Sequence, residues 1–317
     1  MDKKRKIIIS IIFLIILIFT PLIIFQQKED KVVDVFIPKG SSPHKIAQIL
    51  KDSDVISSTK LFLFLVKIKD YSTKLQAGLY EFNKKDSSFT ILNKLKNGDS
   101  KNIKVIIPEG FNIKQIANVL SENGICNENK FIELATSQNL EGYLFPNTYM
   151  LLPQMDEQEV IKIMNDEFNK FWTEENEERL KQINKSKKDV IILASIVEKE
   201  AVDDKERPII AGIFINRLSK GIRLESCATV LYAMGINKER LSLEDLKFES
   251  PYNTYRNKGL PPGPICNPGA KSIDAVLNPI ITENLYFVSK GNGTHYFSST
   301  FEQHIKNKIV SKKKAIK

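Results

Sequence analysis

Histidine and cysteine are scarce in this 317-residue chain, which contains three of each. The histidines, His44, His295 and His304, do not fall into the H-E-x-x-H pattern of a zinc peptidase, so neither a metal nor another cofactor is predicted. Three cysteines cannot all pair within one chain, so at most one disulfide is expected. A thiol hydrolase built on Cys227 and His295 is disfavoured because neither lies in a strongly basic or helix N-terminal context.

Acidic residues are also relatively few: 47 basic residues outnumber 38 acidic ones and give the chain a net charge of +9. The basic residues are scattered and alternate with acids, as in KSKKD and DDKER, which is typical of a solvated surface. Such a charge would suit anionic lipid or an anionic wall polymer. Nucleic acid is not expected as a partner, because most of the chain is predicted to be exported.

Charge is missing altogether from residues 7–25, an apolar run that follows the basic residues 1–6. At ~1.5 Å per residue this run spans roughly 28 Å, about one hydrocarbon core. The preceding lysines and arginine predict a cytoplasmic N-terminus, with residues 1–6 as a cytoplasmic stub. We therefore predict a single-pass protein of the cell membrane, anchored by 7–25, with its remaining domains outside the cytoplasm. A cleaved signal peptide is the alternative, although no small-residue cleavage site follows.

A repeat follows the apolar run. The pattern Val35-Phe36-Ile37-Pro38-Lys39-Gly40 recurs 70 residues later as Val105-Ile106-Ile107-Pro108-Glu109-Gly110, and a helical pattern follows each copy. In the first copy a second helix (60–68), an extended segment (78–82) and a further helix (89–95) are expected. We predict a LysM-like α+β module at 32–103, which either binds glycan or acts as a spacer, and a second LysM-like unit at 104–150.

The remainder, with 104–150 packed against it, is predicted to be a larger α+β catalytic domain spanning 104–317. Helices are expected at 157–172 and 189–200, and Pro208 should open another that ends near Gly221. The residues around 291–293 predict a hairpin between strands 285–288 and 295–297. Ser299 and Glu302 fit a capping box for a last helix.

Glu198 is the candidate general acid. The helix Leu193-Ala194-Ser195-Ile196-Val197-Glu198 is almost entirely apolar, and Glu198 shares its helical face with Ile191 and Ala194. Its carboxyl should therefore face dry, packed surroundings that disfavour the charged form, as a proton donor requires. An ordinary polar end to a buried helix is the alternative.

A candidate sugar-binding region lies at 250–269. Residues 259–269 read GLPPGPICNPG, a stiff loop that can be neither a helix nor a central strand. Just before it, Tyr252, Asn253 and Tyr255 combine aromatic rings with an amide, a mixture that stacks on sugars and hydrogen-bonds to N-acetyl groups. These residues could instead only shape the loop. Arg217, near the end of its helix, could reach a carboxylate or balance the helix dipole.

Several stretches together resemble the MltG (YceG-like) endolytic murein transglycosylase family. They are LASIVEKE (193–200), INRL (215–218), SCATVLYAMG (226–235), SPYNTYRNKGLPPGPICNPG (250–269) and THYFSSTFEQH (294–304). The resemblance covers nearly all of the exported part, with departures at Glu225, where glutamine is expected, and Asn147, where aspartate is usual.

The resemblance implies cleavage of the β-1,4 bond between N-acetylmuramic acid and N-acetylglucosamine in nascent glycan strands. It places Glu198 as the single catalytic acid, which would then act as a base and close a 1,6-anhydro ring. Substrate-binding residues are expected within the matching stretches: Arg217, Ser226, Tyr252, Asn253, Thr254, Tyr255, Asn267 and His295.

Two other functions stay open. A muramidase would hydrolyse the same bond with water held by Glu200, Asp203 or Glu225, although Glu200 lies roughly 200° around the helix from Glu198. A non-catalytic wall-binding scaffold would need no acid. Peptidoglycan strands are the expected partner, and a membrane anchor makes cell-wall synthases, or proteins of the divisome and elongasome, plausible protein partners.

Overall fold

The computed structural model describes residues 30–238 and 240–315, so the predicted stub at 1–6 and span at 7–25 lie outside it. No helix within the described part is long and apolar enough to cross a bilayer. The chain divides into two compact units between Asn102 and Ile103. Both combine helices with small sheets, which agrees with the predicted α+β class. The domain boundaries of the sequence analysis stay predictions.

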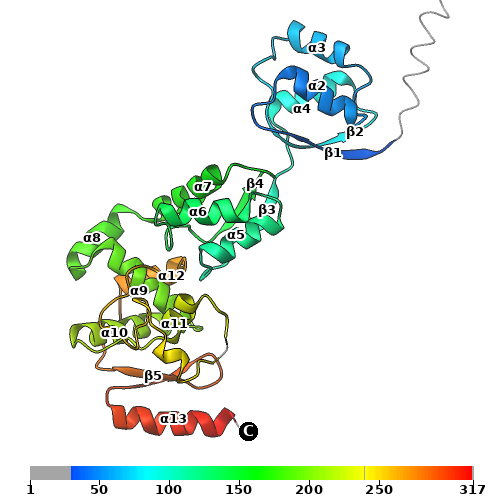
Figure 1. Ribbon diagram of the computed structural model, residues 1–317. Helices are drawn as coiled ribbons and strands as arrows, with labels where there is room; N and C mark the ends of the chain where they lie inside the picture. Colours follow the sequence, from blue (N-terminus) through cyan, green and yellow to red (C-terminus); the bar gives the residue numbers. More distant parts are fainter. Residues whose placement is uncertain (1–29, 239, 316–317) are drawn as a thin grey trace, which may run out of the picture. The chain divides into compact units, whose positions relative to one another are not determined.

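The first unit has the strand–helix–helix–strand order expected from the sequence, followed by one further helix. Strands β1 and β2 pair antiparallel, with Val32 opposite Asn83 and Ile37 opposite Gly78. Three helices cover one face of this sheet (Figure 1). The elements are β1 (Val32–Ile37), α2 (Pro43–Asp52), α3 (Thr59–Ile68), β2 (Gly78–Asn83) and α4 (Ser88–Asn97).

Alternation along the two strands creates the core of this unit. Val35 and Ile37 of β1 and Tyr80 and Phe82 of β2 point inward and are at most 2% exposed. Ser58 caps α3 by accepting a hydrogen bond from the Leu61 amide at 3.3 Å, so residues 57–60 form the N-terminal end of this helix.

The second unit begins with the other copy of the repeat. Strands β3 and β4 pair antiparallel, from Ile103 opposite Leu151 to Ile106 opposite Thr148. Helix α7 adds Val160, Ile161 and Met164 to the core of this copy. The elements are β3 (Ile103–Ile106), α5 (Ile113–Glu122), α6 (Glu128–Ser137), β4 (Thr148–Leu151) and α7 (Glu157–Phe171).

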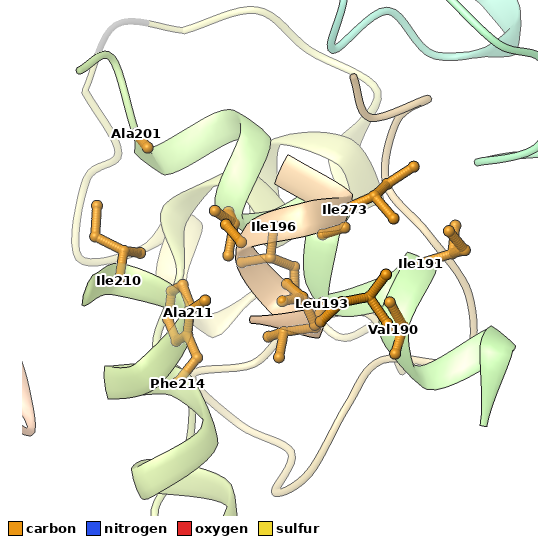
Figure 2. Packing of buried hydrophobic residues seen from close by; sticks show 14 of the residues in the cluster. Val190, Ile191, Leu193, Ile196, Ala201, Ile210, Ala211, Phe214 and Ile273 are labelled. Atoms are coloured by element: carbon orange, nitrogen blue, oxygen red, sulfur yellow. The ribbon is translucent and has the colours of Figure 1, made fainter. Parts of the chain in front are cut away.

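The rest of this unit is organised around α9, which has no solvated face between Val190 and Val197. Figure 2 shows Ile196 of this helix gathered with Ile210 and Phe214 of α10 and with Ile273 of α12. The elements are α8 (Glu174–Ile183), α9 (Lys187–Glu200), α10 (Arg207–Ser219), α11 (Cys227–Met234), the short 3-10 helix η2 (Asp245–Lys247), α12 (Ala270–Leu277), β5 (Tyr286–Ser289), β6 (His295–Ser298) and α13 (Phe301–Ala315).

Most predicted elements of this region are present, and one cap differs. The hairpin forms, with Tyr286 opposite Ser298, and residues 259–269 contain no helix or strand. The last helix, however, is capped by Thr300, whose hydroxyl accepts from the Gln303 amide at 3.3 Å. The predicted box of Ser299 and Glu302 is therefore wrong by one residue, because the hairpin extends to Ser298 and delays the helix start.

Candidate active site

Two glutamates leave the last turn of α9 in different directions. The helix ends at Glu200, because Ala201 is extended (φ −94°, ψ 125°). Glu198 and Glu200 differ by two positions, which separates their side chains by roughly 200° around the axis. Each carboxyl consequently meets its own set of neighbours, and those neighbours decide what each can do.

The Glu198 carboxyl is buried, as predicted, but its surroundings are charged rather than apolar. Its side chain is 6% exposed, and Oε1 lies 3.2 Å from Nη1 of Arg207, itself buried. Oε2 accepts a hydrogen bond from the Gly269 amide at 3.0 Å. Both contacts stabilise a carboxylate. The expectation of a dry environment that disfavours charge is thus corrected, because an arginine and a backbone donor reach the helix from elsewhere in the chain.

A third carboxyl, that of Glu109, lies beside this ion pair. Burial, and secondarily the charge of Glu198, raises the pKa of Glu109. Gly269 accommodates the Glu109 carboxyl, since any Cβ at Gly269 would overlap it. Gly110 also contacts the site: a Cβ there would lie 3.4 Å from Cγ of Glu198, and its φ of +78° favours glycine.

Glu200 has a different environment, in which no cation of residues 30–238 or 240–315 forms an ion pair with it. Its Oε1 accepts a hydrogen bond from the Ser226 hydroxyl at 2.5 Å. Burial raises the pKa of Glu200, while Ser226 and the charge of His295 oppose the shift. Among the described side chains, Ser226 is the hydrogen-bond donor to this carboxyl, and it binds Oε1.

Tyr255 and Cys227 adjoin the Glu200 carboxyl. The Tyr255 hydroxyl lies 3.1 Å from the Cys227 sulfur, and burial together with the charge of Glu200 contributes to raising the pKa of both groups. Cys227 is the first residue of α11, so the expectation that it lacks a helix N-terminal position is wrong. It contacts Tyr255 rather than His295, and all three cysteines of the chain are free.

Asn253 and Thr254, predicted to bind substrate, are fully buried within their loop. The Asn253 amide donates to the carbonyls of Leu246 (3.0 Å) and Phe248 (2.8 Å) and accepts from the Tyr255 amide at 2.9 Å. The Thr254 hydroxyl accepts from the Ser226 amide at 3.1 Å. These contacts favour the other role left open by the sequence, that of shaping the loop, and they hold Ser226 and Tyr255 beside Glu200.

Asn267 and Tyr252 gather around Glu141, a residue that the sequence analysis did not single out. Glu141 accepts hydrogen bonds from the Asn267 amide at 3.2 Å and from the Tyr232 hydroxyl at 3.3 Å. Burial raises the pKa of Glu141 to about 7. The Tyr252 ring contacts Tyr232, with ring centroids 5.1 Å apart. Asn267 also binds backbone next to the second copy of the repeat, donating to the Phe111 carbonyl at 2.9 Å.

Arg217 and His295 are both buried and engaged with other groups of the chain. Arg217 donates to the carbonyls of Arg223 (2.8 Å) and Leu285 (3.0 Å) and pairs with Glu225 at 2.6 Å. It thus reaches a carboxylate, one of the two roles expected. Nδ1 of His295 lies 2.7 Å from a carboxylate oxygen of Glu206.

Glu109, Glu141 and Arg207 also belong to this region, although no motif in the sequence had indicated them. Glu109 lies within the repeat and Arg207 precedes Pro208 at a helix start, so both have local explanations. Glu141 precedes a Gly-Tyr-Leu-Phe-Pro turn, the only local signal. No cluster of His, Cys, Asp and Glu among the described residues has the geometry of a metal site.

Comparison with known proteins places the chain in a family. The model of the YceG-like family matches residues 35–309. The chain belongs to the YceG-like family. It is 36% identical to a protein of Bacillus subtilis named endolytic murein transglycosylase, over 90% of this chain and 88% of that protein. A protein of the same name from Streptococcus pneumoniae is 30% identical over 87% of this chain, which spans 58% of it.

A crystal structure of a YceG-like protein from Listeria monocytogenes is also similar. It matches with a TM-score of 0.59 and 33% identity, and the match covers 88% of this chain and 99% of that one.

Proposed function

We propose that this protein is an endolytic murein transglycosylase, with Glu200 as the acid that cleaves the MurNAc-β-1,4-GlcNAc bond of nascent glycan strands. Membership of the YceG-like family and the names of relatives such as that from B. subtilis support the activity. The single observation that favours Glu200 is its desolvated carboxyl, which forms no ion pair within the described residues and accepts a hydrogen bond from Ser226 through one oxygen. Glu198, the candidate from the sequence, is the second candidate for this role.

Glu198 fits the role less well because an acid must hold a proton that it can deliver. The Arg207 guanidinium and the Gly269 amide each bind one of its two oxygens, so neither oxygen is free to meet a glycosidic oxygen. Protonation of Glu198 would remove one of the two carboxylates that pair with the buried Arg207 and would leave Asp204 as the other, at 3.0 Å. Glu198 instead holds the end of α9 in place, so that Glu200 is presented from a fixed backbone.

The reaction needs one carboxyl group acting twice. Glu200 protonates the glycosidic oxygen as the bond to C1 of muramic acid breaks, and an oxocarbenium-like centre forms. The resulting carboxylate then removes the proton of the C6 hydroxyl, whose oxygen attacks C1 and closes the 1,6-anhydro ring. Glu200 regains its proton and no water is consumed. The Ser226 hydroxyl donates to the carboxylate at the intermediate stage, and the Tyr255 hydroxyl lies on the same side of α9.

We predict that Glu200→Gln lowers the turnover of purified nascent glycan by at least about 10²-fold, because glutamine keeps the size but cannot donate the proton. Wild-type activity should fall as pH rises through the raised pKa of Glu200, since the acid form is then lost. Mass spectrometry of the products should find 1,6-anhydro-muramic acid ends.

Glu198→Gln is the matched control, made two residues away on the same helix turn. When activity is normalised to the amount of folded protein, this variant should keep most of the wild-type activity and the same dependence of activity on pH. Loss of turnover in this variant, with normal turnover for Glu200→Gln, would identify Glu198 as the catalytic acid. Reducing ends in place of anhydro ends would identify a muramidase, and full turnover in both variants would favour a non-catalytic scaffold.

We further propose that residues 7–25 anchor the protein in the cell membrane, with residues 1–6 in the cytoplasm and both units outside. The uncharged run after a basic N-terminus supports this. The first unit, LysM-like in the order of its elements, would bind glycan or hold the second unit away from the bilayer. Cell-wall synthases and divisome or elongasome proteins are the partners that such a location would favour.

A further inference from the structure

The outer face of α3 carries an apolar stripe that no other element of the first unit covers. Leu61, Phe64 and Ile68 are 43%, 59% and 62% exposed, and their spacing places them on one side of the helix. Phe89, in the first turn of α4, is 48% exposed. Figure 1 shows α3 on the far side of its unit from strands β1 and β2.

The charged residues of α3 beside this stripe are all positive. Helix α3 reads TKLFLFLVKI and has no acidic residue, while Lys60 and Lys67 flank the apolar side chains. Lys69 follows directly, and its ammonium lies 5.3 Å from the Phe89 ring centroid. Exposed Leu, Ile and Phe with bordering lysines form the pattern of a surface that lies in the headgroup region of a bilayer.

The chain holds this unit close to the proposed anchor. Asp30 is fixed to the unit through Asn83 at 2.7 Å and Lys85 at 3.2 Å, and Lys85 is four residues before Phe89. The apolar run ends at Phe25, so the connection to Asp30 can reach only about 17 Å even when fully extended. A folded unit held within that distance of the bilayer stays near the lipid surface, where the chemistry of its faces determines which one turns toward the lipid.

We infer that the stripe formed by Leu61, Phe64, Ile68 and Phe89 docks on the outer surface of an anionic lipid bilayer. This inference rests on the proposed anchor at 7–25. The aromatic and aliphatic side chains enter the interface, and Lys60, Lys67 and Lys69 lie at the level of the anionic headgroups. The contact would fix the rotation of the first unit about its tether.

Tryptophan quenching in vesicles tests the contact on the full chain. Phe64→Trp places a reporter in the stripe, and the wild type, whose single tryptophan is the buried Trp172, provides the baseline. The protein is reconstituted in vesicles of phosphatidylcholine and phosphatidylglycerol, with or without bromines on the acyl chains. Insertion by 5–10 Å should lower the added emission about two-fold in brominated vesicles.

The matched control is Phe36→Trp, on the sheet face that points away from the helices and nearer to the anchor in sequence. Its emission should not respond to bromine. Lys67→Glu combined with Lys69→Glu should weaken the quenching of the Phe64→Trp reporter. Equal emission from that reporter with and without bromine would overturn the inference, as would a concentration-dependent shift without bromine sensitivity, which would indicate a second copy of the chain.

Flotation of the vesicles at alkaline pH separates the two proposals. Protein that fails to float has no membrane span, and the anchor itself is then wrong. If the protein floats but the emission of Phe64→Trp is the same with and without bromine, the anchor is supported and the docking surface is wrong.

Discussion

At the scale of single residues, four glutamates of similar intrinsic acidity behave differently because their neighbours differ. Glu198 has a guanidinium and an amide, Glu200 has a hydroxyl, and Glu141 has several neutral donors in a buried position. Glu109 is beside another carboxylate. Burial raises the pKa of Glu109, Glu141 and Glu200, and the groups around each of these carboxyls add to that shift or oppose it.

The raised pKa of Glu141 predicts that the stability of the protein depends on pH. Its pKa is raised from 4.5 to about 7 in the folded protein, so between these values the folded state holds a proton that the unfolded state has lost. The contribution of Glu141 to the free energy of unfolding is therefore complete below pH 4.5. It is lost as pH rises to about 7, and the total loss is roughly 3 kcal/mol.

Glu141→Gln should remove that dependence. Denaturant unfolding at pH 5 and pH 8 should find the variant gaining about 3 kcal/mol relative to wild type at the higher pH. Glu133→Gln, an exposed position on α6, is the control and should show no such gain. A constant difference between Glu141→Gln and wild type would mean that Glu141 is not a proton-binding group in this range.

At the scale of elements, the Arg207 side chain connects three helices. From the start of α10 it bonds Glu198 of α9 at 3.2 Å and Ser272 of α12 at 2.5 Å. Gly269, the N-cap of α12, binds the other oxygen of Glu198. The polar contacts at this corner therefore fix how α9, α10 and α12 meet, while the apolar cluster in Figure 2 supplies the burial.

Arg207→Met should destabilise the second unit by about 3–5 kcal/mol, because it leaves Glu198 buried without its cation. The double variant Glu198→Leu, Arg207→Met removes both charges and should recover most of that loss. Thermal or denaturant unfolding measures both. If the double variant is as unstable as the single one, packing at this corner rather than charge compensation dominates.

The repeat illustrates how similar elements acquire different neighbours. Both copies form a strand, two helices and a returning strand. The turn of the second copy, Pro108-Glu109-Gly110, is joined to the loop before α12, with the Gly110 amide donating to the Asn267 carbonyl at 2.9 Å. The turn of the second copy therefore forms one side of the Glu198 region.

At the scale of the whole molecule, the two units have separate cores. The core of the first unit contains only residues between Val33 and Leu95, whereas the two cores of the second unit begin at Ile103 and at Tyr143. Since every residue placed around Glu198 and Glu200 comes from the second unit, the chemistry and the proposed lipid contact belong to different units.

A protein made of residues 103–317 alone should fold and cleave soluble glycan at a rate within about ten-fold of the full chain, because its cores are complete. Calorimetry and product analysis check this. An unfolded or inactive fragment would mean that the first unit supplies stability or substrate contacts to the second.

Much of this protein could be predicted from local sequence. The repeat, the buried helix α9, the hairpin and the stiff 259–269 loop depend on periodicity, proline and glycine, which act over a few residues. What the sequence could not supply was the partner of each carboxyl. Arg207 reaches Glu198 across a turn, Gly269 reaches it from 71 residues away, and Ser226 reaches Glu200 from 26 residues away.

The sequence by itself therefore determined the α+β elements and a glutamate-bearing helix end in a YceG-like chain. Only the tertiary structure decided which glutamate pairs with an arginine and which is desolvated beside a hydroxyl. The reason is physical: helix periodicity tells where a carboxyl points, but its protonation depends on charges and dipoles that folding brings from distant parts of the chain.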